Sequence, residues 1–220
     1  YHKTHIPYDP LFYEQSYFSP GDEIRIYETR HARFAVLICY DQWFPEPARV
    51  AALGGAQIIF YPTAIGHITG QGEPPEGDWH DAWETVQRGH AISNSICVAA
   101  VNRVGREESL CFWGGSFVAD SFGNILAKAS SEREEILLAD LDLSKNQSVR
   151  EGWGFFRNRR PDIYWPIIEM VKEAAPEKGE GTSLEKKLVK GEELCLVDTP
   201  QQLGFHMPAE WEEHEAIWLS

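Results

Sequence analysis

Residues 34–46 read FAVLICYDQWFPE, and the chain changes character within this stretch. Five apolar residues, 34–38, are followed by polar and aromatic residues that end in Pro45 and Glu46. A continuous apolar run bounded by turn residues predicts a buried parallel strand, and Pro followed by Glu predicts the first turn of a helix. Cys39 would then lie at the carboxyl end of a strand, which is the edge of an open α/β sheet where ligands bind.

A thiol in this place has two interpretations. A helix N-terminus after the strand favours the thiolate, which is the reactive nucleophile. Free cysteine is also among the most buried residue types, and the local pattern alone favours a core side chain. The choice between nucleophile and core residue therefore depends on the rest of the chain.

The composition is that of a globular protein with one main domain and an appendage. The chain has 220 residues, of which 43% are hydrophobic and 25% are charged. Its net charge of −14 comes from 20 basic and 34 acidic residues, which disfavours nucleic acid and anionic membranes as partners. An acidic field would attract a cationic substrate, although solubility alone explains such a charge more often than not.

The four cysteines form no CxxC pair and have no ligand-like spacing to histidine; they are Cys39, Cys97, Cys111 and Cys195. This pattern disfavours a disulfide framework and a zinc site, so we expect a cytoplasmic protein without metal. No apolar stretch is long enough to cross a bilayer, and no signal peptide is visible. Because the first residue is Tyr1, we expect the sequence to be a piece of a longer protein.

Apolar runs flanked by turn residues predict strands at 34–38, 57–61, 96–101, 116–119, 125–127 and 136–141. Helices are predicted at 46–53, closed by two glycines, at 79–94, and at 162–175. The second helix carries one face formed by Trp79, Trp83, Val86 and His90. The βαβαβ order of the first three strands favours a parallel buried sheet, and residues 120–124 predict a hairpin turn between the fourth and fifth.

The organisation of the chain changes near its C-terminal end. Residues 1–175 contain all the predicted helices and strands. Residues 176–193 are rich in Lys, Glu and Gly, have no apolar face, and are predicted to be a linker. Residues 194–220 regain apolar and aromatic side chains but are too few to form a domain.

Eight motifs resemble, in chain order, those of the carbon–nitrogen hydrolases of the nitrilase superfamily. They are Lys3–Pro7, Tyr17–Asp22, Ile38–Glu46, Tyr61–Gly66, Gln87–Ala91, Val101–Gly105, Phe112–Phe117 and Trp153–Pro161. Within the superfamily they are most similar to the N-carbamoylputrescine amidase family. The resemblance covers about residues 1–175 and implies a partial four-layer αββα sandwich whose N-terminal part is missing. It also implies a homo-oligomer that needs no metal and no cofactor.

The resemblance implies a site that contains a Glu–Lys–Cys triad. Cys39 matches the nucleophile, Lys3 matches the lysine that stabilises the oxyanion, and Glu14 matches a second, supporting glutamate. The general-base glutamate of the triad would lie upstream of Tyr1. The Cys39 thiolate would attack a ureido or amide carbonyl, whose oxyanion would meet the Lys3 ammonium and the backbone N–H of Tyr40.

The expected reaction releases putrescine, carbon dioxide and ammonia from N-carbamoylputrescine. Tyr40, Trp43, Thr63 and Ala64 are the residues expected around the substrate, although Trp43 suits core packing equally well. Carbamoylases that act on carboxylate-bearing amino acids tend to carry an arginine after the nucleophile, whereas this chain has Gln42 and Trp43. Aromatic side chains and nearby acids suit an amine tail instead.

The acid that would contact the amine is left open by the sequence. Some members of the amidase family carry a glutamate where this chain has Ile68, and Glu73, Glu76 or Asp78 could replace it. Other functions also remain open: another nitrilase-type amidase, such as a β-ureidopropionase or an ω-amidase, or a scaffold without catalysis.

Residues 203–219 resemble the beginning of the agmatine deiminase family. That family makes the substrate which an N-carbamoylputrescine amidase consumes. We therefore expect the parent polypeptide to fuse two enzymes that catalyse consecutive steps of putrescine synthesis, with residues 173–193 as tether. The alternative is an error of gene prediction or sequence assembly that joins neighbouring genes.

Overall fold

The computed structural model describes residues 1–8, 13–70 and 74–169. These residues belong to two compact units, one formed by 1–159 and the other beginning at Arg160. The predicted linker and the C-terminal segment that follows it lie outside the described residues. The fold described below is that of the first unit unless stated otherwise.

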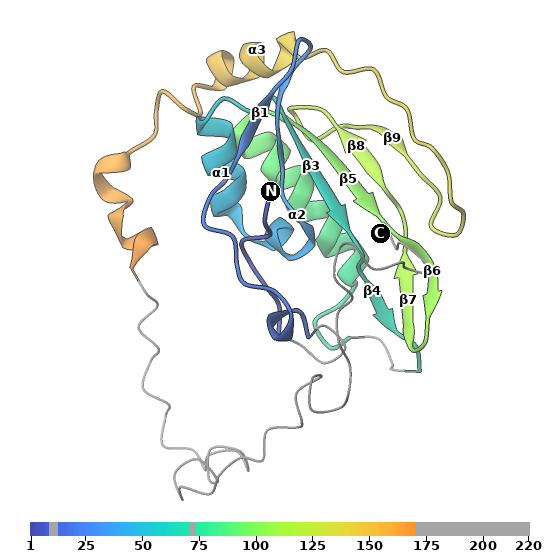
Figure 1. Cartoon of the computed structure of the whole chain (residues 1–220). Coiled ribbons are helices and arrows are strands. Elements are labelled where there is room, and N and C mark those ends of the chain that lie inside the picture. The colour runs from blue at the N-terminus through green and yellow to red at the C-terminus, as the bar shows by residue number, and fades with distance from the viewer. Residues whose placement is uncertain (9–12, 71–73, 170–220) are drawn as a thin grey trace, which may run out of the picture. The chain divides into compact units, whose positions relative to one another are not determined.

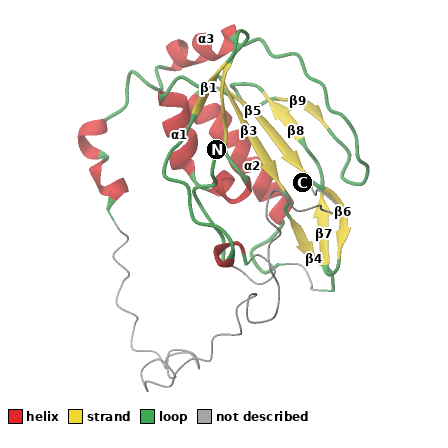
Figure 2. Ribbon diagram, viewed as in Figure 1, coloured by secondary structure: helices red, strands yellow, loops and turns green. Residues whose placement is uncertain are grey.

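The centre of the first unit is a six-stranded sheet in the order β1-β2-β3-β5-β8-β9 (Figures 1 and 2). The strands are β1 (Ile26–Glu28), β2 (Arg33–Val36), β3 (Ile58–Thr63), β5 (Cys97–Asn102), β8 (Phe117–Ala119) and β9 (Ile125–Lys128). The three central strands β2, β3 and β5 are parallel, and the outer strands pair antiparallel. The predicted parallel sheet with an antiparallel part is therefore confirmed.

A second, three-stranded sheet was not predicted from the sequence. It has the order β4-β7-β6 and consists of β4 (Gly66–Ile68), β6 (Val104–Glu107) and β7 (Leu110–Trp113). Gly66 begins β4 where a Cβ atom would lie 2.1 Å from the carbonyl oxygen of Cys111, so only glycine lets the two strands approach. Because β4 directly follows β3, this sheet extends the carboxyl edge of the central strands.

Two helices cover one face of the six-stranded sheet, α1 (Pro45–Leu53) and α2 (Trp79–Asn94) (Figure 1). Pro45 occupies the first turn of α1, and Gly54 and Gly55 follow its end, Gly55 with a φ of 94°. Asp78 caps α2 by accepting hydrogen bonds from the backbone of His80 and Asp81. This α layer and β layer belong to the predicted partial sandwich, and the α/β class is confirmed. No helix in the described ranges has the length and apolarity to span a membrane.

The buried face of α2 differs from the predicted one. It consists of Trp83, Gln87, His90, Ala91 and Asn94, whereas Trp79 is 40% exposed. Some of the polar groups on this face have partners: the side-chain nitrogen of Asn94 donates to the His90 carbonyl, and the His90 ring bonds to the carbonyl of Gln42. The apolar periodicity predicted the wrong buried face of α2, because several buried positions of this helix are polar.

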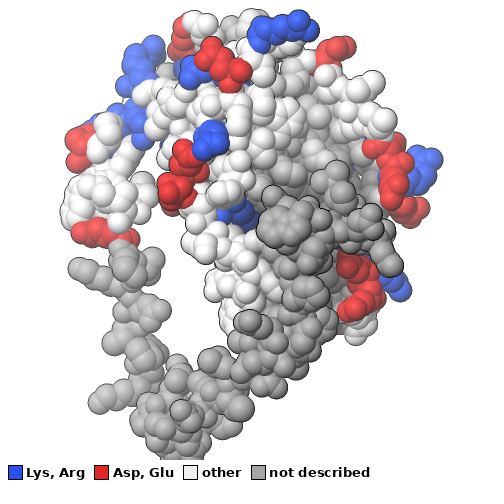
Figure 3. Space-filling view, in the orientation of Figure 1, with Lys and Arg blue, Asp and Glu red and all other residues white. Residues whose placement is uncertain are grey.

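The core lies between the helices and the sheet and forms two clusters. The larger joins small side chains of α1 to β2, β3 and β5, with Leu37, Ile59 and Tyr61 completely buried. The smaller cluster contains Trp83, Ala100, Trp113, Phe117 and Ala119. Charged side chains of both signs are intermixed at the rim of the face shown in Figure 3.

Two predictions about the last part of the chain are wrong. Residues 136–141 form no strand, and Ile136 and Leu138 are 89% and 85% exposed. A strand requires a partner for its backbone groups, and no described segment pairs with this one. The chain continues instead into α3 (Ser144–Trp153). In the second unit, the predicted helix at 162–175 begins as two short 3₁₀ helices, Pro161–Ile163 and Trp165–Ile168, and its end lies outside the described residues.

Candidate active site

Cys39 lies where the chain leaves the central sheet. The amide of Leu37 still donates to the carbonyl of Phe60 on β3 at 2.9 Å, and the chain then turns into a 3₁₀ helix, Cys39–Trp43. Cys39 has a φ of 46°, a left-handed conformation that costs a residue other than glycine roughly 1–2 kcal/mol. Its side chain is partly exposed. The predicted strand–turn placement of the thiol is therefore found, with a 3₁₀ turn between it and α1.

Asp41 closes the turn that carries Cys39. Its backbone amide donates to the Ile38 carbonyl at 3.1 Å, and its carboxylate accepts the Ile38 amide at 2.9 Å. Both hydrogen bonds join Asp41 to Ile38, on either side of Cys39. The chain forms a tight loop here because the Asp41 side chain accepts the backbone N–H of the residue that precedes the thiol.

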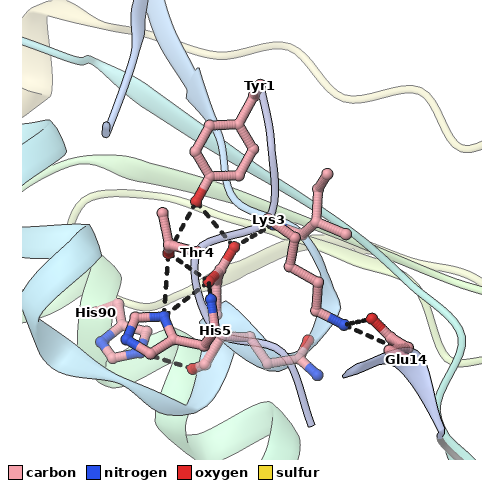
Figure 4. Close-up of polar contacts among 9 residues, drawn as sticks. Tyr1, Lys3, Thr4, His5, Glu14 and His90 are labelled. Atoms are coloured by element: carbon pink, nitrogen blue, oxygen red, sulfur yellow. Dashed lines mark hydrogen bonds and ion pairs between the residues drawn. The ribbon is translucent and has the colours of Figure 1, made fainter. Parts of the chain in front are cut away.

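The same carboxylate binds the N-terminal segment of the chain (Figure 4). The hydroxyls of Tyr1 and Thr4 donate to it at 2.9 and 2.7 Å, and the backbone and ring of His5 contact it at 2.9 and 2.8 Å. The Asp41 side chain has no exposed surface. Two segments more than 30 residues apart are joined at one buried carboxylate.

Lys3 lies within this segment, and its side chain extends toward Glu14 (Figure 4). Its ammonium contacts both carboxylate oxygens of Glu14, at 2.6 and 2.8 Å. The Lys3 side chain is 9% exposed and that of Glu14 is 28% exposed. The structure therefore brings together the two predicted residues as an ion pair largely shielded from solvent.

Gly21 contacts the backbone of residues 1–5, which we call the lysine segment. Its amide donates to the Lys3 carbonyl at 2.8 Å, and a Cβ atom on Gly21 would lie 2.3 Å from the carbonyl oxygen of His2. A side chain at this position would push the lysine segment out of place. Glycine at 21 is required by this close approach rather than by its own φ.

The residues predicted to surround the substrate differ in their surroundings. The ring of Tyr40 packs edge-on against Phe44, so its predicted role depends on its backbone N–H. Trp43 is partly buried and packs against the smaller core cluster. Thr63 ends β3 and is 9% exposed, and Ala64 follows it, half-buried.

Gln42 faces inward rather than toward a substrate. It is completely buried, accepts a hydrogen bond from the indole of Trp83 at 2.9 Å and donates to the Thr63 hydroxyl at 3.4 Å. Its carbonyl contacts His90, whose pKa is lowered because burial disfavours the charged imidazolium. The turn of Cys39 is thereby anchored to α2 and β3.

A pocket of about 790 Å³ lies at the same edge of the sheet. It is lined by β4, the residues before α2 and the end of β7, and its side chains include Glu76, Asp78, Trp79, His80 and Trp113. Trp113 belongs to the core cluster against which Trp43 packs. Among the described residues, the buried indole nitrogen of Trp113 and Nε2 of His80 have no hydrogen-bond partner. The pocket combines acids, aromatic faces and unsatisfied polar atoms.

Residues 1–151 match the family model described as carbon-nitrogen hydrolase. The chain belongs to the carbon–nitrogen hydrolase family. Its hydrolase relatives include the N-carbamoylputrescine amidase of Solanum tuberosum, which is 43% identical over 181 residues, or 77% of this chain and 59% of that protein. The citrullinase of Francisella tularensis is 42% identical over 175 residues, covering 76% of this chain and 59% of that protein.

The fold agrees with this family. The crystal structure of a carbon–nitrogen hydrolase from Helicobacter pylori G27 matches with a TM-score of 0.72 and 44% identity, over 76% of this chain and 60% of that one. The chain thus spans about 59% of the length of the curated relatives named above. By these matches it belongs to the carbon–nitrogen hydrolases of the nitrilase superfamily.

Asp41 is the site residue whose role was not predicted from the sequence. Its position two residues after the thiol was visible, but an acid in a polar turn is usually solvated. The partners Tyr1, Thr4 and His5 surround Lys3 in the sequence, and all of them can donate hydrogen bonds. A cluster of donors around the lysine, with one acid in the nucleophile turn, is the pattern that would have revealed the network.

Proposed function

We propose that the full-length polypeptide carrying this chain is a cysteine amidohydrolase that converts N-carbamoylputrescine to putrescine, carbon dioxide and ammonia. One observation carries the proposal: the strained turn of Cys39 is tied through Asp41 to the segment that holds Lys3 against Glu14. This arrangement supplies a nucleophile, a cation and a second carboxylate on one framework. The name of the relative from Solanum tuberosum supports the substrate.

The proposed reaction begins when the Cys39 thiolate attacks the ureido carbonyl carbon. The carbonyl oxygen becomes an oxyanion, which the Lys3 ammonium and the Tyr40 N–H stabilise by about 3–4 kcal/mol for one such donor. Collapse of the intermediate breaks one C–N bond, expels that nitrogen as an amine after it has taken up a proton, and leaves a carbamoyl thioester on Cys39. Water then attacks the same carbonyl carbon, which regenerates the thiol and releases a carbamic acid, and this acid decomposes to carbon dioxide and the second amine. We assign the proton transfers to a glutamate upstream of Tyr1 and the positioning of Lys3 to Glu14.

The pocket beside Trp113 is our candidate for the amine end of the substrate. Asp78 already caps α2, so we assign the contact with the substrate ammonium to Glu76, with the ring of Trp79 as a cation–π surface. Glu76 would then take the part of the glutamate that Ile68 replaces. Both residues line the pocket.

Citrulline is the second candidate substrate because a relative is named citrullinase. It shares the ureido group and an amine with N-carbamoylputrescine but adds a carboxylate. The side chain of Gln42 is held in the core by Trp83 and Thr63, so position 42 offers no cation to a carboxylate. We therefore favour the substrate without the carboxylate.

The test is an assay of the full-length polypeptide on N-carbamoylputrescine, citrulline, N-carbamoyl-β-alanine and an ω-amide of a dicarboxylic acid. We expect kcat/KM for N-carbamoylputrescine to exceed the others by at least about tenfold, because an unpaired buried charge costs more than 1.4 kcal/mol. Equal turnover of a carboxylate-bearing ureido acid would contradict the substrate assignment. Complete inactivity, with Cys39 no more reactive to alkylation than Cys111, would favour a scaffold.

Glu76→Gln sharpens the assignment of the amine site. We expect KM for N-carbamoylputrescine to rise by about tenfold or more, since a charge-assisted hydrogen bond is lost. N-butylurea, which has the same ureido group without the amine, is the matched control and should be unaffected. An equal effect on both compounds would place Glu76 outside the amine site.

We further propose that the active polypeptide is a cytoplasmic homo-oligomer joined to an agmatine-deiminase-like module that begins within residues 194–220. The resemblance of residues 203–219 supports the fusion, and the free thiols of Cys39, Cys97 and Cys111 fit a reducing compartment. Sequencing the intact locus tests the fusion: a stop codon between the two modules would end it.

A further inference from the structure

Asp41 is a buried carboxylate with an unusually complete set of donors. Its Oδ1 accepts from the hydroxyl of Thr4 and the backbone amide of His5 and contacts the ring of His5. Its Oδ2 accepts from the Tyr1 hydroxyl and the Ile38 amide. Burying a carboxylate is costly unless its lone pairs are satisfied, so these contacts must form together for the turn to exist.

The donors come from two segments with different tasks. The Ile38 amide immediately precedes Cys39 and belongs to the strained nucleophile turn. Tyr1, Thr4 and His5 lie on both sides of Lys3. The Asp41 carboxylate therefore hydrogen-bonds both to the backbone beside Cys39 and to residues on either side of Lys3.

The network acts on Lys3 through its neighbours and not by direct contact. The Lys3 side chain extends toward Glu14, while Thr4 and His5 turn toward Asp41 (Figure 4). The ring of His5 also stacks on Phe44 at 3.8 Å between ring centroids, at the end of the nucleophile turn. The lysine segment is thus attached to both ends of the turn. At the beginning of the turn, Tyr1 and the Ile38 amide share the Asp41 carboxylate, and at its end the ring of His5 stacks on Phe44.

We propose that Asp41 is a positioning residue, which fixes the lysine segment to the nucleophile turn so that the Lys3 ammonium and the Cys39 thiol meet the same carbonyl group. The inference deepens the proposed function and rests on it. Asp41 touches neither the thiol nor the ammonium in the described contacts. Its effect is geometric: displacement of reacting groups by about 1 Å can cost on the order of 100-fold in rate.

Both carboxylate oxygens are needed for this role. Asn at position 41 keeps the shape but replaces one acceptor with an NH₂ donor. Whichever way the amide is oriented, the NH₂ group faces either Thr4 and His5 or Tyr1 and the Ile38 amide. Asp41→Asn therefore weakens the hydrogen bonds to one of these two pairs of donors without leaving a cavity.

The experiment compares Asp41→Asn with Asp120→Asn in the full-length polypeptide. Asp120 is a matched control because its carboxylate also closes a turn, accepting from the backbone of Phe122 and Asn124 between β8 and β9. We expect Asp41→Asn to lower kcat at least about 100-fold with KM within about threefold, and Asp120→Asn to leave both unchanged. A kcat within threefold of the wild type for folded Asp41→Asn would overturn the proposal.

Thr4→Val and Tyr1→Phe keep the proposal testable if Asp41→Asn does not fold. Each removes one donor to Asp41, and we expect kcat to fall about tenfold while KM stays within threefold. Where both can be made, Asp41→Asn and Thr4→Val should not be additive in kcat, because both change the hydrogen-bond network of the same side chain. Additive losses, or losses in melting temperature alone, would assign Asp41 a purely structural role.

A separate measurement distinguishes failure of this inference from failure of the proposed function. A wild-type polypeptide that hydrolyses no ureido or amide substrate would overturn the function before any variant is made. The rate of alkylation of Cys39 by iodoacetamide, relative to Cys111 in the same molecule, then tests the positioning. We expect Asp41→Asn to lower that ratio at least fivefold, and an unchanged ratio would refute the inference.

Discussion

The two ends of the central parallel strands carry cysteines in opposite circumstances. Cys39 follows the carboxyl end of β2 in a left-handed, partly exposed turn. Cys97 begins β5 at the amino end, is 2% exposed, and lies 3.6 Å from the side-chain oxygen of Asn146 on α3. Burial raises the pKa of the Cys97 thiol to about 11.

The difference lies in what each edge does with its backbone groups. At the amino edge, the backbone amide of Cys97 and the side-chain amide of Asn146 both donate to the Gln57 carbonyl, and the thiol is buried beneath α3 contacts. At the carboxyl edge, the Asp41 carboxylate accepts hydrogen bonds from the Ile38 amide, next to the thiol, and from the hydroxyls of Tyr1 and Thr4. The amino edge therefore buries its thiol, while the carboxyl edge holds a partly exposed thiol beside a polar network, at the edge where α/β sheets bind ligands.

The largest contrast is expected between the two thiols themselves. Cys39→Ala should lower kcat by at least about 1,000-fold, because the nucleophile is lost, with little change in melting temperature. Cys97→Ala should retain activity and lose about 1–2 kcal/mol in the free energy of unfolding, because it removes a packed side chain. Both effects are measured by turnover and thermal denaturation. A Cys97→Ala variant as inactive as Cys39→Ala would erase the distinction between the edges.

The ion pair of Lys3 provides the next largest effect. Lys3→Met should reduce kcat by about 100- to 1,000-fold, since the donor to the oxyanion is removed. Lys128→Met is the control: Lys128 is 41% exposed and pairs with Glu84 on α2, and such surface pairs contribute only about 0–1 kcal/mol. Steady-state kinetics of both variants separate the two cases. Similar losses for both would indicate a general effect of charge.

Two glycines give a smaller and purely steric comparison. Gly21→Ala places a methyl group 2.3 Å from the His2 carbonyl oxygen, so we expect the lysine segment to shift and kcat to fall about tenfold. Gly89→Ala on α2 meets no atom within 4 Å and should stabilise the protein by about 0.5–1 kcal/mol. Kinetics and melting temperatures test both. Unchanged kinetics in Gly21→Ala would show that the close approach is not needed.

The smallest effect concerns pH and the anchor of the turn in α2. Burial lowers the pKa of His90 in the folded state, so below about pH 6.5 the unfolded chain binds a proton that the folded protein does not. The stability should therefore fall as the pH falls from 7 to 5. His90→Gln should make the melting temperature, measured from pH 5 to pH 7, depend less on pH. An identical pH dependence in His90→Gln would contradict this.

The sequence was informative where one pattern has one structural meaning. The apolar run before Cys39, the Pro–Glu start and double-glycine end of α1, and the turn at 120–124 all formed where predicted. Short strands such as β4 and β6 were missed because three or four residues contain little periodicity. The segment 136–141 has the composition of a strand, but pairing depends on a partner that its own residues do not specify.

The site was predicted unevenly for a related physical reason. Cys39, Lys3 and Glu14 were predicted as site residues through motifs, and the structure pairs the last two directly. Their connection through Asp41 joins residues 36 to 40 positions apart, and no local pattern encodes such a distance. Buried polar positions on α2 were likewise hidden, because their partners lie on other elements.

Gln42 limits how this protein could evolve toward other substrates. Replacement of Gln42 by arginine would add a cation that can bind a carboxylate, but it would leave the Trp83 indole without its acceptor in the core. Such a change would therefore lower the stability of the fold unless Trp83 on α2 changed as well. A change at Gln42 would alter the core as well as the turn, so we expect adaptation to proceed more readily through the residues lining the pocket.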